Sequence, residues 1–355
     1  MRILFVASCL GFGGAERVIS ILSKGFVSKG HEVGIYLTNP DSVSAYVIDS
    51  RVTIFSCKTQ GKFNLLKDLR KNVKDYDPDI VVPFLTYQCI YTVFALLGTK
   101  YPVVVCERSD PYVIHNNSKI RFIARDISFW LANGAVFQTE GARDYFHKSV
   151  AKKSCVIYNP IDISSLPSEY SQERTDRIVT VGRLTKYKNQ VMLISAFAKI
   201  KDEFPTTVLE FYGDGDEKDN LVECSKQYGV FDRVFFMGNV TNVYELIKDA
   251  KIFAFTSDHE GMPNALAEAM SIGIPCVSTD CSPGGARALI QNGYNGIIVP
   301  VNDPIAFSEA LRMLLLDDDM AKELGKNAVQ LRDKLNIDTI VNRWEEYFLK
   351  VISFR

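Results

Sequence analysis

The chain has 355 residues, which is more than one hydrophobic core usually contains and about right for two domains. Hydrophobic residues make up 47% of the chain, and its formal net charge is −1. No apolar run reaches the roughly 18 residues of a membrane-spanning helix, and the eight cysteines include no C-x-x-C pair typical of a zinc site. We therefore expect a globular, cytoplasmic protein without a structural metal.

The small net charge conceals a difference between the two halves of the chain. Residues 1–165 carry 20 Lys and Arg against 14 Asp and Glu, whereas residues 166–355 carry 21 against 28. The basic first half indicates an anionic partner, such as a membrane surface or a phosphorylated molecule, or only a solvated face. We expect no nucleic-acid partner.

Short apolar runs alternate with helix-length segments along the whole chain. In the first half these runs are 3–7, 32–37, 52–56, 80–83, 103–106, 135–138 and 154–157. In the second half they are 177–181, 208–212, 234–237, 252–255 and 275–278. Such repetition is typical of β-α-β units, which form parallel sheets covered by helices.

The repetition pauses at the polar segment 158–176, which contains two prolines, and then starts again. We therefore predict an α/β fold with two doubly wound domains, 1–165 and 166–338. The remaining residues, 339–355, place their apolar positions on one helical face, which could pack on either domain.

A glycine-rich loop follows the first predicted strand. Gly13 and Gly14 allow the backbone to approach a ligand closely at the start of a helix. A dinucleotide-binding fingerprint would need glycine where Glu16 stands, and an acidic residue at the end of the second strand, which instead runs out at Thr38-Asn39. An NAD site is therefore the weaker interpretation, and a plain tight turn is another.

Two cations follow the first strand of the second domain. Arg183 and Lys188 lie where a strand ends and a helix begins, the edge at which open α/β sheets bind ligands. There they can neutralise a diphosphate, Arg183 in a bidentate manner and Lys188 as a point charge. A solvated loop is the alternative.

The segment 257–268 places two carboxylates, Glu260 and Glu268, on either side of a predicted helix start at Pro263. Backbone N–H groups at such a start can bind phosphate, and the residues that would surround a ligand here are Gly261, Met262, Pro263 and Asn264. Glu268 can accept hydrogen bonds from a ribose, which leaves Glu260 to contact a neighbouring sugar. Alternatively, both are ordinary surface residues.

Two further segments suggest sites that the pattern only partly supports. Asp214-Gly215-Asp216 matches a metal-binding D-x-D, but it lies between a strand and a helix, where a turn explains it better, so we expect no metal.

In 119–130, cations alternate with Ile, Phe and Trp, a pattern typical of a membrane-surface helix or of a helix packed on a sheet.

Together these motifs resemble glycosyltransferase family 4, of the two-Rossmann-domain class called GT-B, over essentially the whole chain. The matching motifs are Gly13-Gly14, Asn159-Pro160, Gly182-Arg183 with Lys188-Asn189, Gly213-Asp214-Gly215, and the pair Glu260 and Glu268. The resemblance implies two domains that face each other across a cleft. The first would bind the acceptor, the second would bind a nucleoside-diphosphate sugar, and a helix at 339–355 would return to the first domain.

The resemblance also implies roles for individual residues. Arg183 and Lys188 would bind the diphosphate, Glu268 the ribose, Glu260 the donor sugar, and Gly14 the distal phosphate. The segment 238–240, with Asn239 and Val240, would contact the base. Transfer would retain the anomeric configuration and need neither metal nor cofactor, with Arg183, Lys188 and Glu260 as the catalytic residues.

The segments 107–111 and 282–287 look like those of bacterial transferases for capsule, exopolysaccharide or lipid-linked glycans. This likeness favours a UDP-sugar donor, a polyprenyl-diphosphate-linked acceptor and peripheral attachment to the inner face of the plasma membrane through the first domain. One feature departs from the family: where relatives have a histidine after the fifth strand, this chain has Glu107, Arg108 and Asp110. A non-catalytic sugar-nucleotide scaffold and a UDP-sugar epimerase of the same class are the alternatives.

Overall fold

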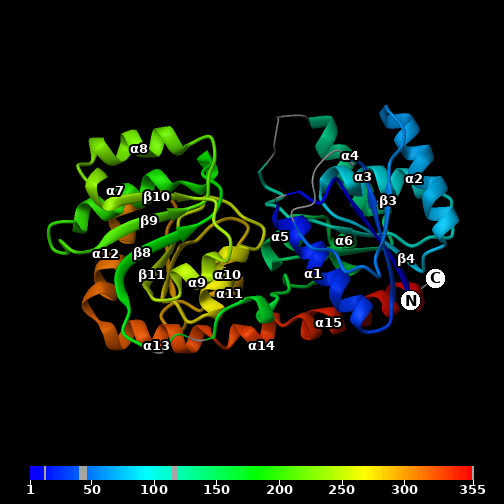
Figure 1. Ribbon diagram of the computed structural model, residues 1–355. Coiled ribbons are helices and arrows are strands. Elements are labelled where there is room, and N and C mark those ends of the chain that lie inside the picture. Colours follow the sequence, from blue (N-terminus) through cyan, green and yellow to red (C-terminus); the bar gives the residue numbers. More distant parts are fainter. Residues whose placement is uncertain (12, 40–45, 114–118, 169, 171, 354–355) are drawn as a thin grey trace. The chain divides into compact units, whose positions relative to one another are not determined.

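The computed structural model describes residues 1–355 with the exception of 12, 40–45, 114–118, 169, 171, 354 and 355. The chain divides into two compact units (Figure 1). The N-terminal unit comprises Met1–Pro160 and Leu335–Arg355, and the C-terminal unit comprises Ile161–Lys334. The division therefore falls within the polar segment 158–176, and the end of the chain belongs to the same unit as its beginning.

The N-terminal unit is built on parallel strands. These are β1 (Arg2–Ala7), β2 (Glu32–Leu37), β3 (Thr53–Ser56), β4 (Ile80–Pro83), β5 (Val104–Cys106), β6 (Gly134–Phe137) and β7 (Ser154–Val156). They pair in the orders β3-β2-β1-β4 and β5-β6-β7. Parallel bridges of Val81 with Val103, and of Phe84 with Cys106, place β5 beside β4. Central strand β1 is buried from Ile3 to Ala7, as expected for a parallel strand with helices on both faces.

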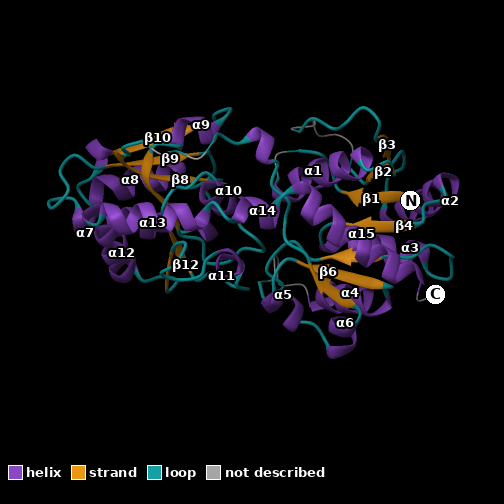
Figure 2. Ribbon diagram, turned by 90° about the horizontal axis from the view of Figure 1, so that it is seen from below, coloured by secondary structure: helices purple, strands orange, loops and turns teal. Residues whose placement is uncertain are grey.

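Helices cover both faces of this sheet (Figure 2). They are α1 (Gly14–Ser28), α2 (Lys62–Tyr76), α3 (Thr86–Leu96), α4 (Lys119–Leu131), α5 (Glu140–Asp144), α6 (Lys148–Lys152) and α15 (Ile337–Ser353). Because side chains alternate along a strand, Ile3 and Phe5 face α1 and α15, whereas Leu4 and Val6 face α2, α3 and α4.

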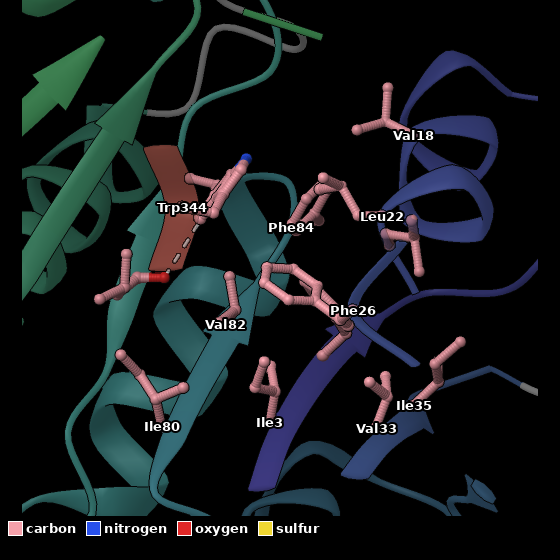
Figure 3. Close-up of a cluster of buried hydrophobic side chains, with 14 of the residues drawn as sticks. Ile3, Val18, Leu22, Phe26, Val33, Ile35, Ile80, Val82, Phe84 and Trp344 are labelled. Atoms are coloured by element: carbon pink, nitrogen blue, oxygen red, sulfur yellow. Dashed lines mark hydrogen bonds between the residues drawn. The ribbon is translucent and has the colours of Figure 1, made fainter. Parts of the chain in front are cut away.

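The core between the sheet, α1 and α15 contains a cluster of aromatic rings. Figure 3 shows Val18, Leu22 and Phe26 of α1 gathered with strand residues and with Trp344 of α15. Trp344 is fully buried, stacks on Phe84 with a centroid distance of 6.5 Å, and lies 5.3 Å from Phe348. The helix at the end of the chain is therefore part of the N-terminal core.

Glycine allows α1 and α15 to come close. A Cβ added at Gly25 would lie 2.7 Å from a methyl group of Ile337 and 2.7 Å from one of Val341. Real Cβ atoms do not approach so closely, so a larger residue here would push the two helices apart.

The C-terminal unit contains a second parallel sheet. Its strands are β8 (Thr175–Val181), β9 (Val208–Tyr212), β10 (Val234–Gly238), β11 (Ala250–Phe255), β12 (Cys276–Thr279) and β13 (Ile297–Val299). They pair in the order β10-β9-β8-β11-β12-β13. Strand β13 was not predicted from the sequence, because three residues between Gly296 and Pro300 are too short to show a period.

Helices of the C-terminal unit follow the strands in alternation. They are α7 (Gln190–Ile200), α8 (Lys218–Gln227), α9 (Val243–Ile247), α10 (Asn264–Ser271), α11 (Gly285–Leu289), α12 (Pro304–Leu316), α13 (Asp318–Ala328) and α14 (Leu331–Leu335), with short 3₁₀ turns η1 (Ile163–Ser165), η2 (Lys186–Lys188) and η3 (Phe231–Arg233). Buried residues of α7, α8 and α12 pack on one face of the sheet around Phe197, Phe211 and Phe307.

Among the residues that the structure describes, no helix is long and apolar enough to cross a membrane. The eight cysteines are all free. Burial raises the pKa of the Cys106 and Cys281 thiols to about 12, so both are neutral at physiological pH and act as small apolar residues.

We predict that Phe348→Ala lowers the free energy of unfolding of the N-terminal unit by about 3–5 kcal/mol, because it leaves a cavity between Phe26 and Trp344. Trp344 is one of only two tryptophans, and Trp130 also belongs to this unit, so tryptophan fluorescence during urea unfolding measures it directly. Leu349→Ala, on the exposed side of the same helix, is the matched control and should change stability by less than about 0.5 kcal/mol. Equal losses in both variants would contradict the prediction.

Candidate active site

The residues predicted to bind a ligand in the second domain come from loops at the carboxyl ends of neighbouring strands. Arg183 and η2 follow β8, and the loop 256–263 follows β11, which pairs with β8 in the middle of the sheet. In a parallel sheet these carboxyl ends share one edge, and ligands of open α/β sheets bind there. The structure therefore brings together two sequence segments that are more than sixty residues apart.

Lys188 and Glu260 form an ion pair at this edge. The Lys188 ammonium donates to Glu260 Oε1, and both side chains are less than one-fifth exposed. Ser257 Oγ also donates to Glu260 Oε1 at 3.4 Å, and the ammonium lies 5.1 Å from the centre of the Phe255 ring. At this degree of burial each charge depends on the other, because removing one partner leaves the other uncompensated.

Backbone and amide hydrogen bonds fix the two loops against each other. The Asp258 amide donates to the Tyr187 carbonyl at 2.9 Å, and Thr256 Oγ1 donates to the Lys188 carbonyl at 2.8 Å. Asn189, in the left-handed region with φ 49°, donates from Nδ2 to Asp258 Oδ1 at 2.7 Å. These contacts place Lys188 beside Glu260 without relying on the ion pair itself.

No sequence motif indicated Thr256 or Asp258 as site residues, and Asn189 occurs only within the Lys188-Asn189 motif. Their role is to position Lys188 and Glu260, and it depends on a contact between distant segments. The one local signal was Asn189 before a helix, since asparagine tolerates the left-handed conformation better than most residues.

The loop before α10 is packed rather than open. Gly261, Met262 and Pro263 are buried and Asn264 is half-buried. The helix begins at Asn264, with Pro263 as its N-cap residue, one position later than the sequence predicted. A Cβ at Gly285 would lie 2.4 Å from the Gly261 carbonyl oxygen and 2.9 Å from Pro263 Cδ, so only glycine allows α11 to approach this loop.

Glu268 lies inside the unit, on α10. It is 2% exposed, and the Tyr244 hydroxyl, which belongs to α9, donates a hydrogen bond to its Oε2. The spacing of Glu260 and Glu268 therefore places one carboxylate in a loop and the other on a buried helical position. Tyr244 is a residue that no sequence motif indicated.

The Asp214-Gly215-Asp216 segment forms a turn against the Arg183 loop. A Cβ at Gly213, whose φ is 139°, would lie 2.1 Å from the Gly182 carbonyl oxygen. The Leu184 amide donates to the Asp214 carbonyl at 3.0 Å. Both aspartate side chains are exposed, and within the described part of the chain no group of three or more His, Cys, Asp or Glu could bind a metal.

Asn239 and Val240 are exposed residues directly after β10. The Gly213 amide donates to the Gly238 carbonyl at 2.8 Å, and this bond ties the start of the 238–240 segment to the turn beneath Arg183. Exposed Arg183, the Lys188 pair and the 238–240 segment therefore belong to one edge of the C-terminal sheet.

The glycine loop of the N-terminal unit lies at the carboxyl end of β1. Gly13 is the N-cap residue of α1 and exposed Gly14 is its first residue. A Cβ at Gly13 would lie 2.0 Å from Glu16 Oε2, so the Glu16 side chain folds back onto the loop that glycine keeps narrow. Glu16 stands at the position of the last glycine of a dinucleotide fingerprint, and its carboxylate lies against Gly13.

Polar groups gather after β5, where the resemblance led us to expect a histidine and the chain instead has Glu107, Arg108 and Asp110. Glu107 is 1% exposed, and its Oε1 accepts from the Ser109 amide at 3.1 Å and from Ser109 Oγ at 2.8 Å. Arg108 donates from Nη1 to Asn159 Oδ1 at 2.9 Å and lies 4.1 Å above the Phe84 ring, and burial lowers its pKa. Glu107 Oε2, Arg108 Nε and Nη2, and Asp110 Oδ2 are buried without a hydrogen-bond partner among the described residues.

Comparison with known proteins assigns this architecture to a family. The model of glycosyltransferase family 4 matches residues 12–165, and that of glycosyl transferases group 1 matches residues 165–331. Together the two models cover residues 12–331, and the chain is a glycosyltransferase. Like its relatives, this glycosyltransferase has an α/β fold with two Rossmann-like domains of the GT-B class, as the sequence predicted.

Several relatives of the glycosyltransferase match along nearly its whole length. Two are N-acetylgalactosaminyltransferases of Campylobacter jejuni named for acceptors linked to undecaprenol diphosphate. The first is 28% identical over 99% of this chain and 98% of its own length. The second is 27% identical over 93% of this chain and 94% of its own length. The amylovoran biosynthesis glycosyltransferase of Erwinia amylovora is 25% identical over 94% of this chain and 95% of its own. Anabaena HepE in complex with UDP-glucose has the same fold, with a TM-score of 0.81 and 19% identity over 99% of this chain and 100% of its own.

We predict that Gly285→Ala destabilises the glycosyltransferase by about 1–3 kcal/mol and lowers its transfer rate, because the added methyl group displaces the Gly261 backbone next to Glu260. Thermal unfolding and a transfer assay measure the two effects. Arg287→Ala on the same short helix is the control, since its exposed pair with Asp280 contributes less than about 1 kcal/mol. Wild-type behaviour of Gly285→Ala would contradict the close approach.

Proposed function

We propose that this glycosyltransferase transfers a hexose or N-acetylhexosamine from a nucleoside-diphosphate sugar, with UDP favoured, to a hydroxyl group of a polyprenyl-diphosphate-linked glycan. The anomeric configuration is retained and no metal takes part. The observation that carries the proposal is the Lys188–Glu260 pair beside Arg183 at the carboxyl edge of the C-terminal sheet. The UDP complex of HepE supports the donor class, and the acceptors named for the Campylobacter relatives support the acceptor class.

Arg183 and Lys188 bind the donor diphosphate. Arg183 is exposed at the strand end, where a guanidinium can bind two phosphate oxygens in a bidentate manner, while Lys188 is fixed by η2. Two cations balance the two negative charges of a bound diphosphate, which is the task of a divalent metal in other transferases. This balance is why Asp214 and Asp216 are not needed as metal ligands.

Each of the remaining predicted residues contacts a different part of the donor. Glu260 contacts the transferred sugar, because it lies at the ammonium that binds the diphosphate. Glu268 accepts from the ribose, and the hydrogen bond from the Tyr244 hydroxyl keeps that carboxylate in place. Asn239 and Val240 contact the base, and the backbone of Gly261–Asn264 faces the phosphates.

The reaction exchanges one bond at the anomeric carbon for another. The bond from this carbon to the phosphate oxygen breaks, and the acceptor oxygen forms a bond on the same face of the sugar. The acceptor proton passes to the departing phosphate oxygen. Arg183 and Lys188 stabilise the negative charge that develops on the diphosphate, which is how fixed charges lower such barriers.

We predict that one nucleoside diphosphate raises the melting temperature of the protein in the presence of EDTA, because a ligand of the native state stabilises it by mass action. The measurement compares UDP, GDP, ADP, CMP and NAD, followed by UDP- and GDP-sugars. UDP should give the largest shift. A shift with NAD alone, or one that EDTA abolishes and a divalent metal restores, would contradict the proposal, as would a requirement for Asp216 in that response.

We predict that Lys188→Ala slows transfer by roughly a hundred- to a thousandfold, equivalent to about 2.7–4 kcal/mol of barrier, because the leaving diphosphate loses a fixed cation. Lys186→Ala is the matched control, since Lys186 is an exposed lysine on the same 3₁₀ turn and should retain near-normal rates. Single-turnover kinetics with saturating donor separate the chemical step from binding. Similar losses in both variants would show that the turn, and not the Lys188 charge, matters.

A further inference from the structure

Asn302 is an exposed asparagine in the loop 300–303, which joins the edge strand β13 to α12. Its backbone is left-handed, with φ 58°, a conformation that glycine and asparagine adopt more readily than most residues. A glycine would therefore suffice for the turn itself. The asparagine side chain adds an amide group that the turn does not need, and it lies outside every motif that carries the family resemblance.

The loop around Asn302 is fixed from both sides. On the strand side, the Val299 carbonyl accepts from the Asp280 amide at 2.8 Å, which continues the pairing of β13 with β12. On the helix side, Asp303 is the N-cap residue of α12, and its Oδ1 accepts from two backbone N–H groups of the first turn at 3.1 and 2.9 Å. The place of the Asn302 side chain is therefore set by the strand and the helix on either side of it.

The amide of Asn302 meets that of Asn189 at the candidate site. Asn302 Oδ1 accepts from Asn189 Nδ2 at 2.7 Å, and the same nitrogen donates to Asp258 Oδ1 at 2.7 Å. A side-chain NH₂ group has two hydrogens, so these two bonds use both of them. The loops that follow β8, β11 and β13 thus meet at one nitrogen, although Asn189 and Asn302 are 113 positions apart in the chain.

Two acceptors fix the orientation of the Asn189 side chain. The last torsion of an amide side chain is only weakly restricted, so a single hydrogen bond would leave the group free to turn. Asn189 ends η2 and is also the N-cap residue of α7, with φ 49°. The residue before it is Lys188, whose ammonium pairs with Glu260. An Asn189 held at both hydrogens therefore holds the backbone from which the Lys188 side chain extends.

We propose that Asn302 is a positioning residue for the donor diphosphate, because it acts through Asn189 to keep the Lys188 ammonium where the phosphates bind. This role rests on the proposed function, in which Lys188 binds the diphosphate. Asn302 itself contacts neither phosphate nor sugar, so its loss weakens the diphosphate contact and leaves the fold intact. An exposed hydrogen bond between neutral groups contributes modestly, and the expected effect is a several-fold change rather than a complete loss of binding.

Isothermal titration of the full chain with UDP and with UMP tests this role, with GDP and GMP in their place if GDP gives the larger melting shift. Asn302→Gly removes the amide and keeps the left-handed turn. We expect it to weaken UDP binding about three- to tenfold, and UMP binding less, because UMP lacks the second phosphate. Asn242→Gly is the matched control, since Asn242 is also exposed and left-handed, with φ 54°, and both affinities should stay within about twofold of the wild type.

A double-mutant cycle shows whether the effect passes through Lys188. If Asn302 acts by placing that ammonium, Asn302→Gly should have no further effect on UDP affinity in a chain that already carries Lys188→Ala. Nucleotide concentrations are raised in that background to allow for weaker binding. Circular dichroism and the melting temperature confirm that the variants are folded, whereas a purely structural role would lower the melting temperature in both backgrounds.

Three outcomes would overturn the positioning role of Asn302. They are wild-type UDP affinity in Asn302→Gly, equal losses for UDP and UMP, and a loss that is as large beside Lys188→Ala as in the wild type. A wild-type chain that binds no nucleoside diphosphate contradicts the proposed function itself, on which this role rests. Wild-type binding of UDP together with an unchanged Asn302→Gly variant refutes the positioning role alone.

Discussion

The candidate site depends on the attachment of η2 to the loop after β11. Lys188 and Glu260 are 72 positions apart in the chain, and three contacts around them, from Thr256, Asp258 and Asn189, bring their loops together without involving either charge. Charge pairing between long side chains would by itself lose much of its benefit to lost rotamer freedom. Because the backbone already sets the separation, little of that entropy remains to be lost when the pair forms.

Glycines at the same edge make this attachment possible. Gly213 and Gly215 approach the carbonyl groups of Gly182 and Leu184, and Gly285 approaches that of Gly261, each at a distance that a Cβ would not allow. The loop after β9 therefore packs backbone to backbone on the loop after β8, and α11, which follows β12, packs in the same way on the loop after β11. Arg183, Asn239 and Val240 at this edge remain exposed, so a polar ligand can reach them.

Much of the fold followed from the sequence because parallel strands and amphipathic helices have local periods. Strand β1 and helix α15 were predicted within two residues. The apolar face of α15 fits either sheet, so only the family resemblance, and not the helical pattern, predicted that it packs in the N-terminal unit. At the site, the spacing of Glu260 and Glu268 identified both carboxylates. It could not show that Glu268 is buried against Tyr244, because that contact depends on the distance between α9 and α10 rather than on any local pattern.

Buried charged groups after β5 in the N-terminal unit are less completely paired than Lys188 in the C-terminal unit. After β5, several buried polar atoms of Glu107, Arg108 and Asp110 lack partners, at a cost of about 1–3 kcal/mol for each unmet group, and the stacking of Arg108 on Phe84 offsets only part of it. At Lys188, by contrast, the charge is fully matched by Glu260. Under the proposed function, a donor phosphate would replace Glu260 as the anionic partner of the Lys188 ammonium, and Glu260 would then turn to the sugar that the phosphate carries.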